Sequence, residues 1–575
     1  MARDWIVIPA WDRCTEAGQR WGVPPLVAQL LFNRGLTLDD DPRNFINPQL
    51  KDLHPPEMLP GARDAARHLA AAIRDGKRIL LYGDYDVDGI TAVAILWHLL
   101  KLAGADPRFY IPHRIGEGYG LNSDALRSIA ADGAEVVVTV DCGVTACEAA
   151  ALAGELGLDL VITDHHMPGT QLPDAAAIVH PTVGGTYPNP HLCGAGVAFK
   201  LAWALAQELS GDTRVNPEYR RFLMLTALPL AALGTIADIV PLRGENRILV
   251  RHGLAALPGA PLAGLQALIE SAGLSRSRID DYDVGFKLAP RLNAAGRMGH
   301  ARLAVELLTR ADENRAREIA LYLDEHNRAR RAKERKTTKE AFEMIERAGL
   351  DGDANRAVVL AGEGWHAGII GLVASRVVDR LHKPTIIISL ENGTAQGSGR
   401  SIDPFQLHDA LQVCAEHLAE FGGHAMAAGL RIEPDKIEAF TEAFVAHANQ
   451  TLTAADLKPR LRLDAETTLD ALNLETVAAI KNLGPFGQGS PKPQLATGWL
   501  ELSGEPRCVG KSRDHLQVTF QQNGAVTKGI AFGQADVADL LKEHRRCRVA
   551  FEPIINDFNG RRSVEMQVIE FKFPE

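Results

Sequence analysis

Acidic residues directly follow several short β-rich runs, and this pattern constrains the fold more than any other feature of the sequence. The runs alternate with helical stretches and span Arg78–Tyr82, Arg108–Ile111, Glu135–Val140 and Leu158–Thr163. Strands that alternate with helices predict βαβ units and a mostly parallel sheet. Open α/β sheets bind their ligands at the carboxyl ends of the strands. The sequence therefore predicts an α/β fold with a polar site at that edge.

Carboxylate and imidazole side chains gather after these runs. The first run leads into the sequence GDYDVDG at residues 83–89, with carboxylates at alternate positions, and the last leads into an Asp-His-His triplet. A further acid ends the stretch Gly234–Asp238. The candidate site residues are Asp84, Asp86, Asp88, Asp141, Asp164, His165, His166 and Asp238. Because strands of one sheet deliver most of them, we expect these side chains to converge.

A cluster with this much negative charge needs cations. Two unit charges about 4 Å apart repel by roughly 4 kcal/mol at an effective dielectric near 20. Mainly oxygen ligands with a histidine favour Mn²⁺ or Mg²⁺ over zinc, and two such ions can clamp a phosphate for in-line attack. Taken singly, the acidic run could be a calcium loop or a solvated turn, the histidine pair a surface feature, and Asp238 a helix cap. An EF-hand loop that begins at Asp84 would need Glu where Ile95 stands.

Longer motifs carry a resemblance to a known family. Asp164-His165-His166 resembles the signature of the DHH phosphoesterases, and GDYDVDG resembles their first motif. Within that superfamily, the chain is similar to the single-stranded-DNA-specific exonucleases over nearly its whole length. The segments that carry this similarity are Pro290–Arg297, Gly364–His366 with Gly368–Gly371, Gly397–Ser401, Gly422–His424 and Gly484–Gly489.

The resemblance implies an α/β fold of several parts. It implies a DHH phosphoesterase lobe with a parallel sheet, a long linking helix, a second α/β DHH-associated lobe and a C-terminal OB-fold β-barrel. The expected boundaries are residues 1–55 for an N-terminal extension, 56–300 for the catalytic lobe, 301–348 for the linking helix, 349–455 for the second lobe and 456–575 for the barrel.

The resemblance also implies roles for the acidic residues. The implied metal ligands are Asp86, Asp88, Asp141, His165 and Asp238, with Asp141 bridging two ions. Asp84 and Asp164 are implied as further ligands or as partners of ligands, and His166 as a group that orients the site or neutralises phosphate charge. The implied catalytic set is Asp141, His165, His166 and Asp238. Two positions depart from the family pattern, because Tyr82 stands where smaller relatives have a histidine ligand, and Ser490 replaces an expected Asn.

Several other residues are candidates for contact with nucleic acid. The phosphate-binding candidates are Arg114, Asn293, Arg297, Ser398, Arg400 and His424. We expect Gly397–Ser401 to form a small-residue loop that lets backbone N–H groups approach a phosphate; an ordinary hairpin turn is the alternative. The charged stretch Asn327–Lys336 is either a solvated helix face or the wall of a cleft. In the barrel, Phe551 and Phe558 with nearby arginines are expected to stack on bases.

The activity implied by the resemblance is a 5′→3′ exonuclease specific for single-stranded DNA, which acts in recombination and repair by two-metal-ion catalysis. Its expected partners are single-stranded DNA, a single-stranded-DNA-binding protein and a recombination helicase, and the enzyme is expected to be a cytoplasmic monomer. The net charge of −10 argues weakly against nucleic acid, but a local basic groove matters more than the total. The alternatives are a DHH enzyme for small phosphate esters and a non-catalytic DNA-binding scaffold.

The apolar segments do not indicate a membrane protein. The longest apolar run, Phe222–Ala237, is interrupted by Pro229 and Gly234, and a membrane span needs about 20 apolar residues. We expect this run to be a buried helix or a pair of strands. The N-terminal residues do not have the pattern of a signal peptide, and the seven cysteines form no CxxC pair that would indicate a zinc site or a disulfide framework.

Overall fold

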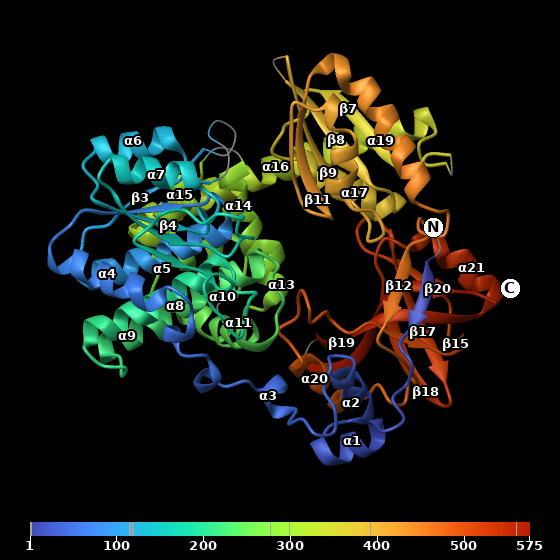
Figure 1. The fold of residues 1–575 in the computed structure, drawn as a ribbon. Helices are drawn as coiled ribbons and strands as arrows, with labels where there is room; N and C mark the ends of the chain where they lie inside the picture. The colour runs from blue at the N-terminus through green and yellow to red at the C-terminus, as the bar shows by residue number, and fades with distance from the viewer. Residues whose placement is uncertain are drawn as a thin grey trace.

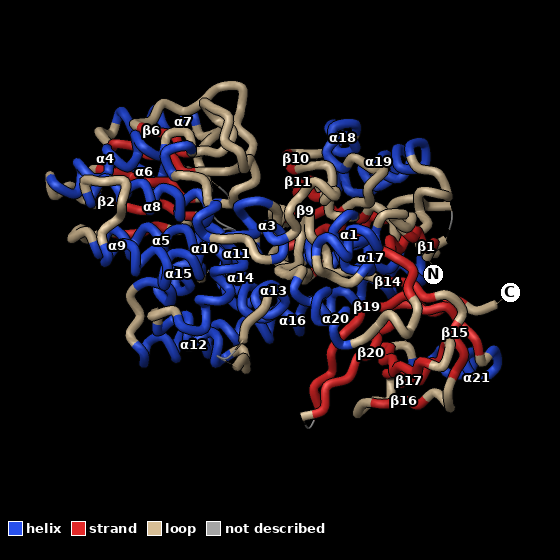
Figure 2. The backbone as a smooth tube through the Cα atoms, turned by 90° about the horizontal axis from the view of Figure 1, so that it is seen from below, coloured by secondary structure: helices blue, strands red, loops and turns tan. Residues whose placement is uncertain are grey.

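The computed structural model describes residues 3–113, 117, 120–275, 278–297, 300–352, 354–391, 393–558 and 560–574. The chain forms three bodies, which Figure 1 shows at the left, the upper right and the lower right. We call them the first lobe, the second lobe and the barrel. In Figure 2 helices dominate the first lobe and strands dominate the barrel.

The first lobe is built on a five-stranded parallel sheet with the order β3-β2-β4-β5-β6. Its strands are β2 (Ile79–Gly83), β3 (Arg108–Tyr110), β4 (Val136–Val140), β5 (Asp159–Thr163) and β6 (Ala177–Val179). Every residue of β2 and β4 is buried. Strands that are covered on both faces are apolar without alternation. The four strands predicted from the β-rich runs are therefore confirmed.

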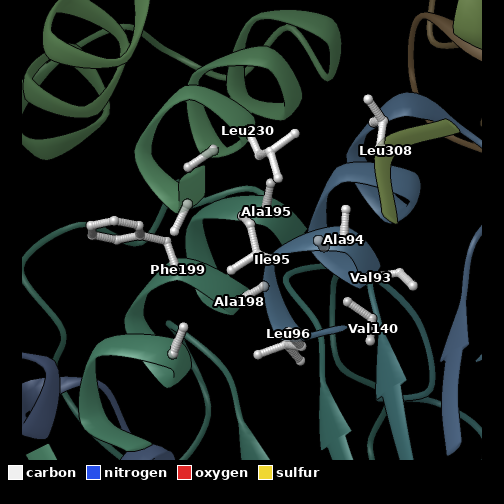
Figure 3. Packing of buried hydrophobic residues seen from close by; sticks show 14 of the residues in the cluster. Val93, Ala94, Ile95, Leu96, Val140, Ala195, Ala198, Phe199, Leu230 and Leu308 are labelled. Atoms are coloured by element: carbon white, nitrogen blue, oxygen red, sulfur yellow. The ribbon is translucent and has the colours of Figure 1, made fainter. Parts of the chain in front are cut away.

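Helices cover both faces of this sheet. Helices α4 (Ala62–Arg74), α5 (Val87–Leu102) and α8 (Gly194–Ser210) lie on one face, and α6 (Ser123–Ala131) and α7 (Cys147–Glu155) lie on the other. The further helices of the first lobe are α9 (Pro217–Phe222), α10 (Leu228–Ala237), α11 (Gly244–Ala256), α12 (Ala263–Ser271), α13 (Asp281–Asp283), α14 (Ala289–Arg297) and α15 (Ala301–Thr309). In the core, Ile95 of α5 lies among Ala195 and Phe199 of α8 and Leu230 of α10 (Figure 3). Because α5 is apolar on nearly all sides, it is buried, and its first turn is fixed where the acidic run ends.

The apolar run predicted as a helix or a strand pair is helical. The segment Pro217–Ala237, which includes the π-helical turn η3 (Leu223–Ala227), is long and apolar enough to cross a membrane. However, 67% of its apolar window is buried inside the protein, and α10 packs against α5, α8 and α11. We therefore describe it as a core helix of the first lobe.

The expected single helix over residues 301–348 is two helices. After α15 the chain turns, and the side chain of Asp312 caps α16 (Glu313–Ala348) by accepting hydrogen bonds from the backbone of Asn314 and Arg315. The first half of α16 packs against α12 and α14 of the first lobe, and its second half packs against α17 of the second lobe. A buried ion pair of 2.8 Å between Arg291 and Asp324 fixes α14 on α16.

The second lobe has a five-stranded sheet with the order β10-β11-β9-β8-β7, in which only β7 and β8 are parallel. Its elements are β7 (Val358–Glu363), α17 (Ile370–Leu381), β8 (Thr385–Glu391), β9 (Thr394–Arg400), α18 (Leu407–Val413), β10 (Glu420–Gly423), β11 (Ala427–Ile432) and α19 (Ile437–Thr451). The expected loop at Gly397–Ser401 is wrong, because residues 397–400 end strand β9. A Cβ on Gly397 would lie 2.7 Å from Leu430 Cδ1. The small residues therefore serve the packing of adjacent strands.

The C-terminal body is a closed barrel. Strands β15, β17, β18, β20 and β19 form a ring, because β19 pairs with both β15 and β20. The elements are β12 (Arg460–Leu463), β13 (Ala465–Thr467), α20 (Leu474–Asn482), β14 (Leu495–Thr497), β15 (Leu500–Leu502), β16 (Arg507–Val509), β17 (His515–Gln522), β18 (Ala525–Ala531), α21 (Ala538–His544), β19 (Arg546–Phe558) and β20 (Arg561–Lys572). This closed ring agrees with the expected OB-fold.

The N-terminal residues pack on this barrel, although the two segments are far apart in sequence. Strand β1 (Asp4–Val7) pairs in parallel with β12. Helix α2 (Pro25–Phe32) places Val27, Leu30 and Leu31 in the apolar core of the barrel, and α1 (Cys14–Trp21) packs on α2. A short helix, α3 (Arg43–Ile46), follows on the way to the first lobe. Figure 1 shows α1 and α2 beside α20.

One buried arginine of α11 joins the first lobe to the barrel. Arg247 is 2% exposed and donates hydrogen bonds of 2.6–3.1 Å to the carbonyls of Leu483, Gly484 and Pro485. It also donates to the carbonyl of Phe45 at 2.8 Å, and its guanidinium carbon lies 3.9 Å from the centroid of the Phe45 ring. Burial lowers the pKa of Arg247 to about 9. The GPFGQG run at Gly484–Gly489 therefore begins at a docking point between two bodies.

Replacing Arg247 should loosen this joint. We expect Arg247→Met to destabilise the protein by at least about 3 kcal/mol, because several buried carbonyls lose a charged donor. Thermal unfolding of the full chain would show this as a fall in Tm of several degrees. Arg63→Met on the exposed face of α4 is the matched control and should leave Tm unchanged. Equal Tm values for the two variants would contradict the role given to Arg247.

Candidate metal centre

The predicted acidic and histidine side chains meet at the carboxyl edge of the first sheet. His165, which follows β5, lies at the centre of the group. Its Nε2 is 3.1 Å from Asp141 Oδ1, 3.7 Å from Asp238 Oδ2 and 3.8 Å from Asp88 Oδ2. The three carboxylates come from the end of β4, the end of α10 and the start of α5. Residues that are distant in sequence thus surround one imidazole.

Three overlapping groups of ligand atoms are close enough to hold cations, with the atoms of each group within 4.8 Å of one another. The groups are Asp141-His165-His166, Asp88-His165-Asp238 and Asp84-Asp86-Asp141. Asp141 belongs to two of these groups and His165 to two. A carboxylate shared in this way can bridge neighbouring ions through its two oxygens, as the resemblance implies for Asp141.

Helix N-termini hold two of the carboxylates. Asp86 caps α5 and accepts hydrogen bonds from the backbone N–H groups of Asp88 and Gly89 at 2.9 and 3.1 Å. The buried Asp88 accepts from Gly194 N at 2.5 Å and Ala195 N at 2.8 Å, at the start of α8. Partial positive charge at a helix N-terminus stabilises an anion. The ends of α5 and α8 therefore fix these side chains and offset part of their mutual repulsion.

Asp164 orients the histidine pair. Its Oδ1 accepts from the backbone N–H groups of His165 and His166 and lies 2.8 Å from His166 Nδ1, and its Oδ2 accepts from Val144 N at 2.9 Å. Although burial opposes both effects, this bond lowers the pKa of Asp164 and raises the pKa of His166. Carboxylates that position ligands commonly make such bonds. The geometry therefore favours a positioning role for Asp164.

Asp141 has an unusual backbone. Its φ is +64°, in the left-handed region that Asp enters more readily than most residues. Its N–H donates to Thr163 O at 2.9 Å, which ties the turn to the neighbouring strand β5. The side chain is 2% exposed and points to His165. The local backbone thus turns the carboxylate from the end of β4 into the centre of the cluster.

The charges of the cluster oppose one another in the absence of cations. Burial, and then the neighbouring carboxylates, raise the pKa of Asp141 well above its usual value and the pKa of Asp238 to about 9. Asp88 is shifted in the same direction, mainly by burial. Asp238 also lies at the C-terminal end of α10, where the helix dipole disfavours an anion. Divalent cations would stabilise all three carboxylates in the charged form.

The remaining donor chemistry also fits Mn²⁺ or Mg²⁺. Nε2 of His165 is buried and makes no hydrogen bond among the described residues, so it can act as a metal ligand. Carboxylate oxygens and an imidazole nitrogen are suitable ligands for Mn²⁺, and Mg²⁺ binds preferentially to the carboxylate oxygens. The residues present therefore fit a pair of divalent cations.

Glycines make room for this cluster, and sequence reasoning did not identify them as site residues. A Cβ on Gly194 would lie 2.6 Å from Cβ and Oδ1 of Asp141, and one on Gly234 would lie 2.6 Å from Asp88 Oδ1. A Cβ on Gly89 would lie 2.8 Å from the backbone of Asp84. The run Gly194-Ala195-Gly196 at the start of α8 was the only local signal of this close approach.

Tyr82 has no part in the cluster. Its side chain is fully buried in the apolar layer of α6 and α7. Its hydroxyl donates to Gly120 O at 2.9 Å, and its ring stacks on Tyr110 at 5.3 Å. Position 82 is thus a core position in this chain, and the group Asp84-Asp86-Asp141 is present without a histidine there.

The phosphate-binding candidates of the first lobe lie at two places. Asn293 Oδ1 accepts from Val87 N at 3.2 Å, so α14 contacts the first turn of α5. Arg297 ends the same helix, but its side chain lies outside the described residues. Arg114 also lies outside the described residues.

In the second lobe, Ser398 and Arg400 lie together. Arg400 Nη1 donates to Ser398 Oγ at 3.3 Å and to Gly399 O at 2.7 Å. Both side chains border Gly371 in the first turn of α17, where a Cβ would lie 2.9 Å from Ser398 Oγ and 3.0 Å from Arg400 Nη2. A guanidinium and a hydroxyl beside a helix N-terminus suit an anion. His424 is exposed between β10 and β11.

One further expectation, for the aromatic residues of the barrel, is wrong in part. Phe551 was expected to stack on bases, but it is fully buried in the barrel core; the side chain of Phe558 lies outside the described residues. An exposed aromatic residue with a nearby cation is Trp499, whose ring lies 5.1 Å from the guanidinium of Arg546. In α16, some residues of the charged stretch form ion pairs within the protein. Arg328, for example, pairs with Asp324 at 2.5 Å.

Comparisons with known proteins cover most of the chain. Family models match the DHH family N-terminal domain over residues 78–228, the DHHA1 domain over 354–450 and the RecJ OB domain over 463–570. The chain is 38% identical over 563 residues to the single-stranded-DNA-specific exonuclease RecJ of Bacillus subtilis strain 168, a match that covers 97% of this chain and 69% of that one. It is 34% identical over 569 residues to the same enzyme of Dickeya dadantii strain 3937, with 96% of each chain covered.

A solved structure supports the same relationship. The crystal structure of RecJ from Thermus thermophilus in complex with Mn²⁺ matches with a TM-score of 0.85 at 30% identity, over 100% of this chain and 80% of that chain. The complex of that protein with Mg²⁺ matches with a TM-score of 0.78 at 29% identity, over 100% of this chain and 79% of that chain.

The close approach of Gly194 to Asp141 can be tested directly. We expect Gly194→Ala to weaken Mn²⁺ binding about 10–100-fold, as the loss of groups that orient ligands does, because the new Cβ displaces the carboxylate. Calorimetric titration of Mn²⁺ measures this affinity. Gly154→Ala in α7, where a Cβ meets nothing within 4 Å, is the matched control. Equal affinities would place Asp141 outside the metal centre.

Proposed function

Because the chain belongs to the RecJ family of single-stranded-DNA-specific exonucleases, we propose that its metal centre removes nucleotides successively from the 5′ end of single-stranded DNA. The chain is a metal-dependent exodeoxyribonuclease that uses Mn²⁺ or Mg²⁺. The observation that carries the assignment of the site is the set of three overlapping ligand groups around Asp141 and His165. Recombination and repair, which need resected DNA ends, are the processes that this activity serves.

We assign the roles at the centre from the contacts described above. The proposed metal ligands are Asp84, Asp86, Asp88, Asp141, His165 and Asp238, with Asp141 bridging. Bound divalent cations would lower the pKa of a water molecule and neutralise phosphate charge. Asp164 holds the imidazole ring of His166, whose Nδ1 is 4.0 Å from Asp141 Oδ1. His166, with its raised pKa, can then carry positive charge toward the phosphate.

The direction in which the strand is degraded depends on a phosphate pocket in the second lobe. We propose that Arg400, Ser398 and the first turn of α17 bind the terminal 5′-phosphate, while His424 contacts the backbone near the scissile bond. Arg114, Asn293 and Arg297 are proposed contacts from the first lobe. The guanidinium, the hydroxyl and the helix N-terminus support this pocket because each of them binds phosphate in other proteins.

The presence of the barrel favours the nuclease over an enzyme that acts on small phosphate esters. A substrate of one or two nucleotides needs no separate binding barrel, whereas OB-folds bind single strands. A scaffold without catalysis would have no need of ligand groups held by two helix N-termini. We therefore prefer the nuclease to both alternatives.

Other properties follow as proposals. We propose that the enzyme acts as a monomer. A single-stranded-DNA-binding protein and a recombination helicase are the proposed protein partners, because both generate or cover the substrate. The proposed location is the cytoplasm, and no membrane is involved.

Removal of the bridging carboxylate tests the centre. We expect Asp141→Asn to lower exonuclease activity by more than about 100-fold, since it removes a ligand and not merely a group that orients one. The assay follows an oligonucleotide labelled at its 3′ end in the presence of Mn²⁺, with circular dichroism to show that the fold persists. Chelation of the metal by EDTA should abolish the activity of the parent protein. A folded variant with undiminished activity would overturn the assignment.

The phosphate pocket predicts dependence on the chemistry of the 5′ end. We expect Arg400→Met to lower kcat/KM for a 5′-phosphorylated strand about tenfold or more, the contribution of a hydrogen bond to a charged group. The value for a 5′-hydroxyl strand should change much less. Arg431→Met, an exposed arginine of β11 in the same sheet, is the control. Equal losses on both substrates would contradict a role in binding the terminal phosphate.

A further inference from the structure

Two aromatic rings lie side by side in solvent on the first lobe. Tyr282 of α13 is 57% exposed and Phe286 of the π-helical turn η5 (Val284–Leu288) is 61% exposed. Their ring centroids are 4.7 Å apart with an interplanar angle of 26°. Single exposed apolar residues are common in folded proteins, whereas contiguous apolar patches mark interaction sites. The two rings stack on each other, and both side chains stay more than half exposed.

Cations accompany this pair of rings. Lys287 Nζ lies 5.9 Å from the centroid of the Tyr282 ring and pairs with Asp283 at 2.6 Å. Arg331 of α16 is exposed and donates to the carbonyl of Phe286 at 3.2 Å. Aromatic rings that stack on bases beside cations that track the phosphates are the combination by which proteins bind single strands without sequence preference.

The pair lies on the helical segment that leads to the metal centre. Elements α13, η5 and α14 run from Asp281 to Arg297 without a break, and Asn293 in this segment contacts the first turn of α5. Phe286 is seven residues before Asn293, a distance of about 10 Å along a helix. Turn η5 also contacts α10, the helix that ends at Asp238.

The other end of the segment contacts the link into the barrel. The carboxylate of Asp281 lies near the backbone of Phe486 in the GPFGQG run. In Figure 1, α13 lies on the side of the first lobe that faces the barrel. The aromatic pair is therefore between the metal centre and the barrel.

We propose that Tyr282 and Phe286 form a platform on which a base of single-stranded DNA stacks as the strand passes from the barrel to the metal centre. Lys287 and Arg331 lie where they can contact the adjacent phosphates. This proposal rests on the proposed exonuclease function and adds a binding site to it. The platform holds a nucleotide some distance from the scissile bond, so it contributes to binding of long strands and not to the chemical step.

The test compares a long and a short substrate. We expect Tyr282→Ala with Phe286→Ala to raise KM for a long oligonucleotide about tenfold or more, the effect of losing a stacked base, with kcat unchanged. Hydrolysis of a 5′-phosphorylated dinucleotide, which is too short to reach the platform, should not change. The exchange Tyr282→Phe with Phe286→Tyr keeps both rings and should restore the KM of the parent.

Two outcomes overturn the proposal. The first is an unchanged KM for the long strand in the double alanine variant, and the second is an equal loss on the dinucleotide, which would show a structural effect. Both differ from failure of the proposed function, in which the parent protein itself would not shorten single-stranded DNA. As an independent measurement, 2-aminopurine placed along a bound strand should be quenched at one internal position by the parent protein and not by the double alanine variant.

Discussion

The repulsion among buried carboxylates at one edge of a parallel sheet is the constraint on which the rest of the structure depends. Backbone dipoles at helix N-termini offset part of this repulsion before any metal binds. The N-terminus of α5 holds Asp86, and the N-terminus of α8 holds both oxygens of Asp88. These contacts fix the carboxylates at spacings that cations can bridge. Burial, and then the neighbouring carboxylates, still raise the pKa of Asp238 at the far end of α10.

Other parts of the molecule serve this arrangement from a distance. Glycines at positions 194 and 234 let α8 and α10 approach the ligands more closely than any side chain would permit. A buried ion pair holds the linking helix α16 on α14, and α14 also contacts α5. Helix α16 thus connects the second lobe to the helices beside the metal centre. Arg247 holds the start of the link into the barrel. Binding surfaces on three bodies are thereby placed around one reactive centre.

The parts that sequence could predict are those that local patterns determine. Buried parallel strands are short apolar runs, and acids that follow them must lie at one edge, so the strands and the convergence of the acidic cluster were accessible. Asp238 was identified as an acid, but the sequence left open whether a helix or a strand precedes it. Residues 397–400 were expected in a loop, because small residues are common in turns and also where strands pack closely. Phe551 was expected at the surface, yet its burial depends on how the barrel closes.

Contacts between distant segments could not be predicted in this way. The pairing of β1 with β12 joins the N-terminal strand to the start of the C-terminal body, and no local pattern specifies it. The aromatic pair on α13 and η5 gave no signal either, because exposed and core aromatic residues look alike in sequence. Only the arrangement of lobes shows that these rings lie between the barrel and the metal centre.

The most direct test of the central claim is anomalous diffraction from crystals of this protein grown with Mn²⁺. The account predicts two strong peaks at the carboxyl edge of the first sheet. One should be bound by Asp88, His165 and Asp238, the other by Asp84 and Asp86, and Asp141 should bridge the two. A peak bound elsewhere, or no peak at this edge, would contradict the claim that the cluster is a two-metal centre.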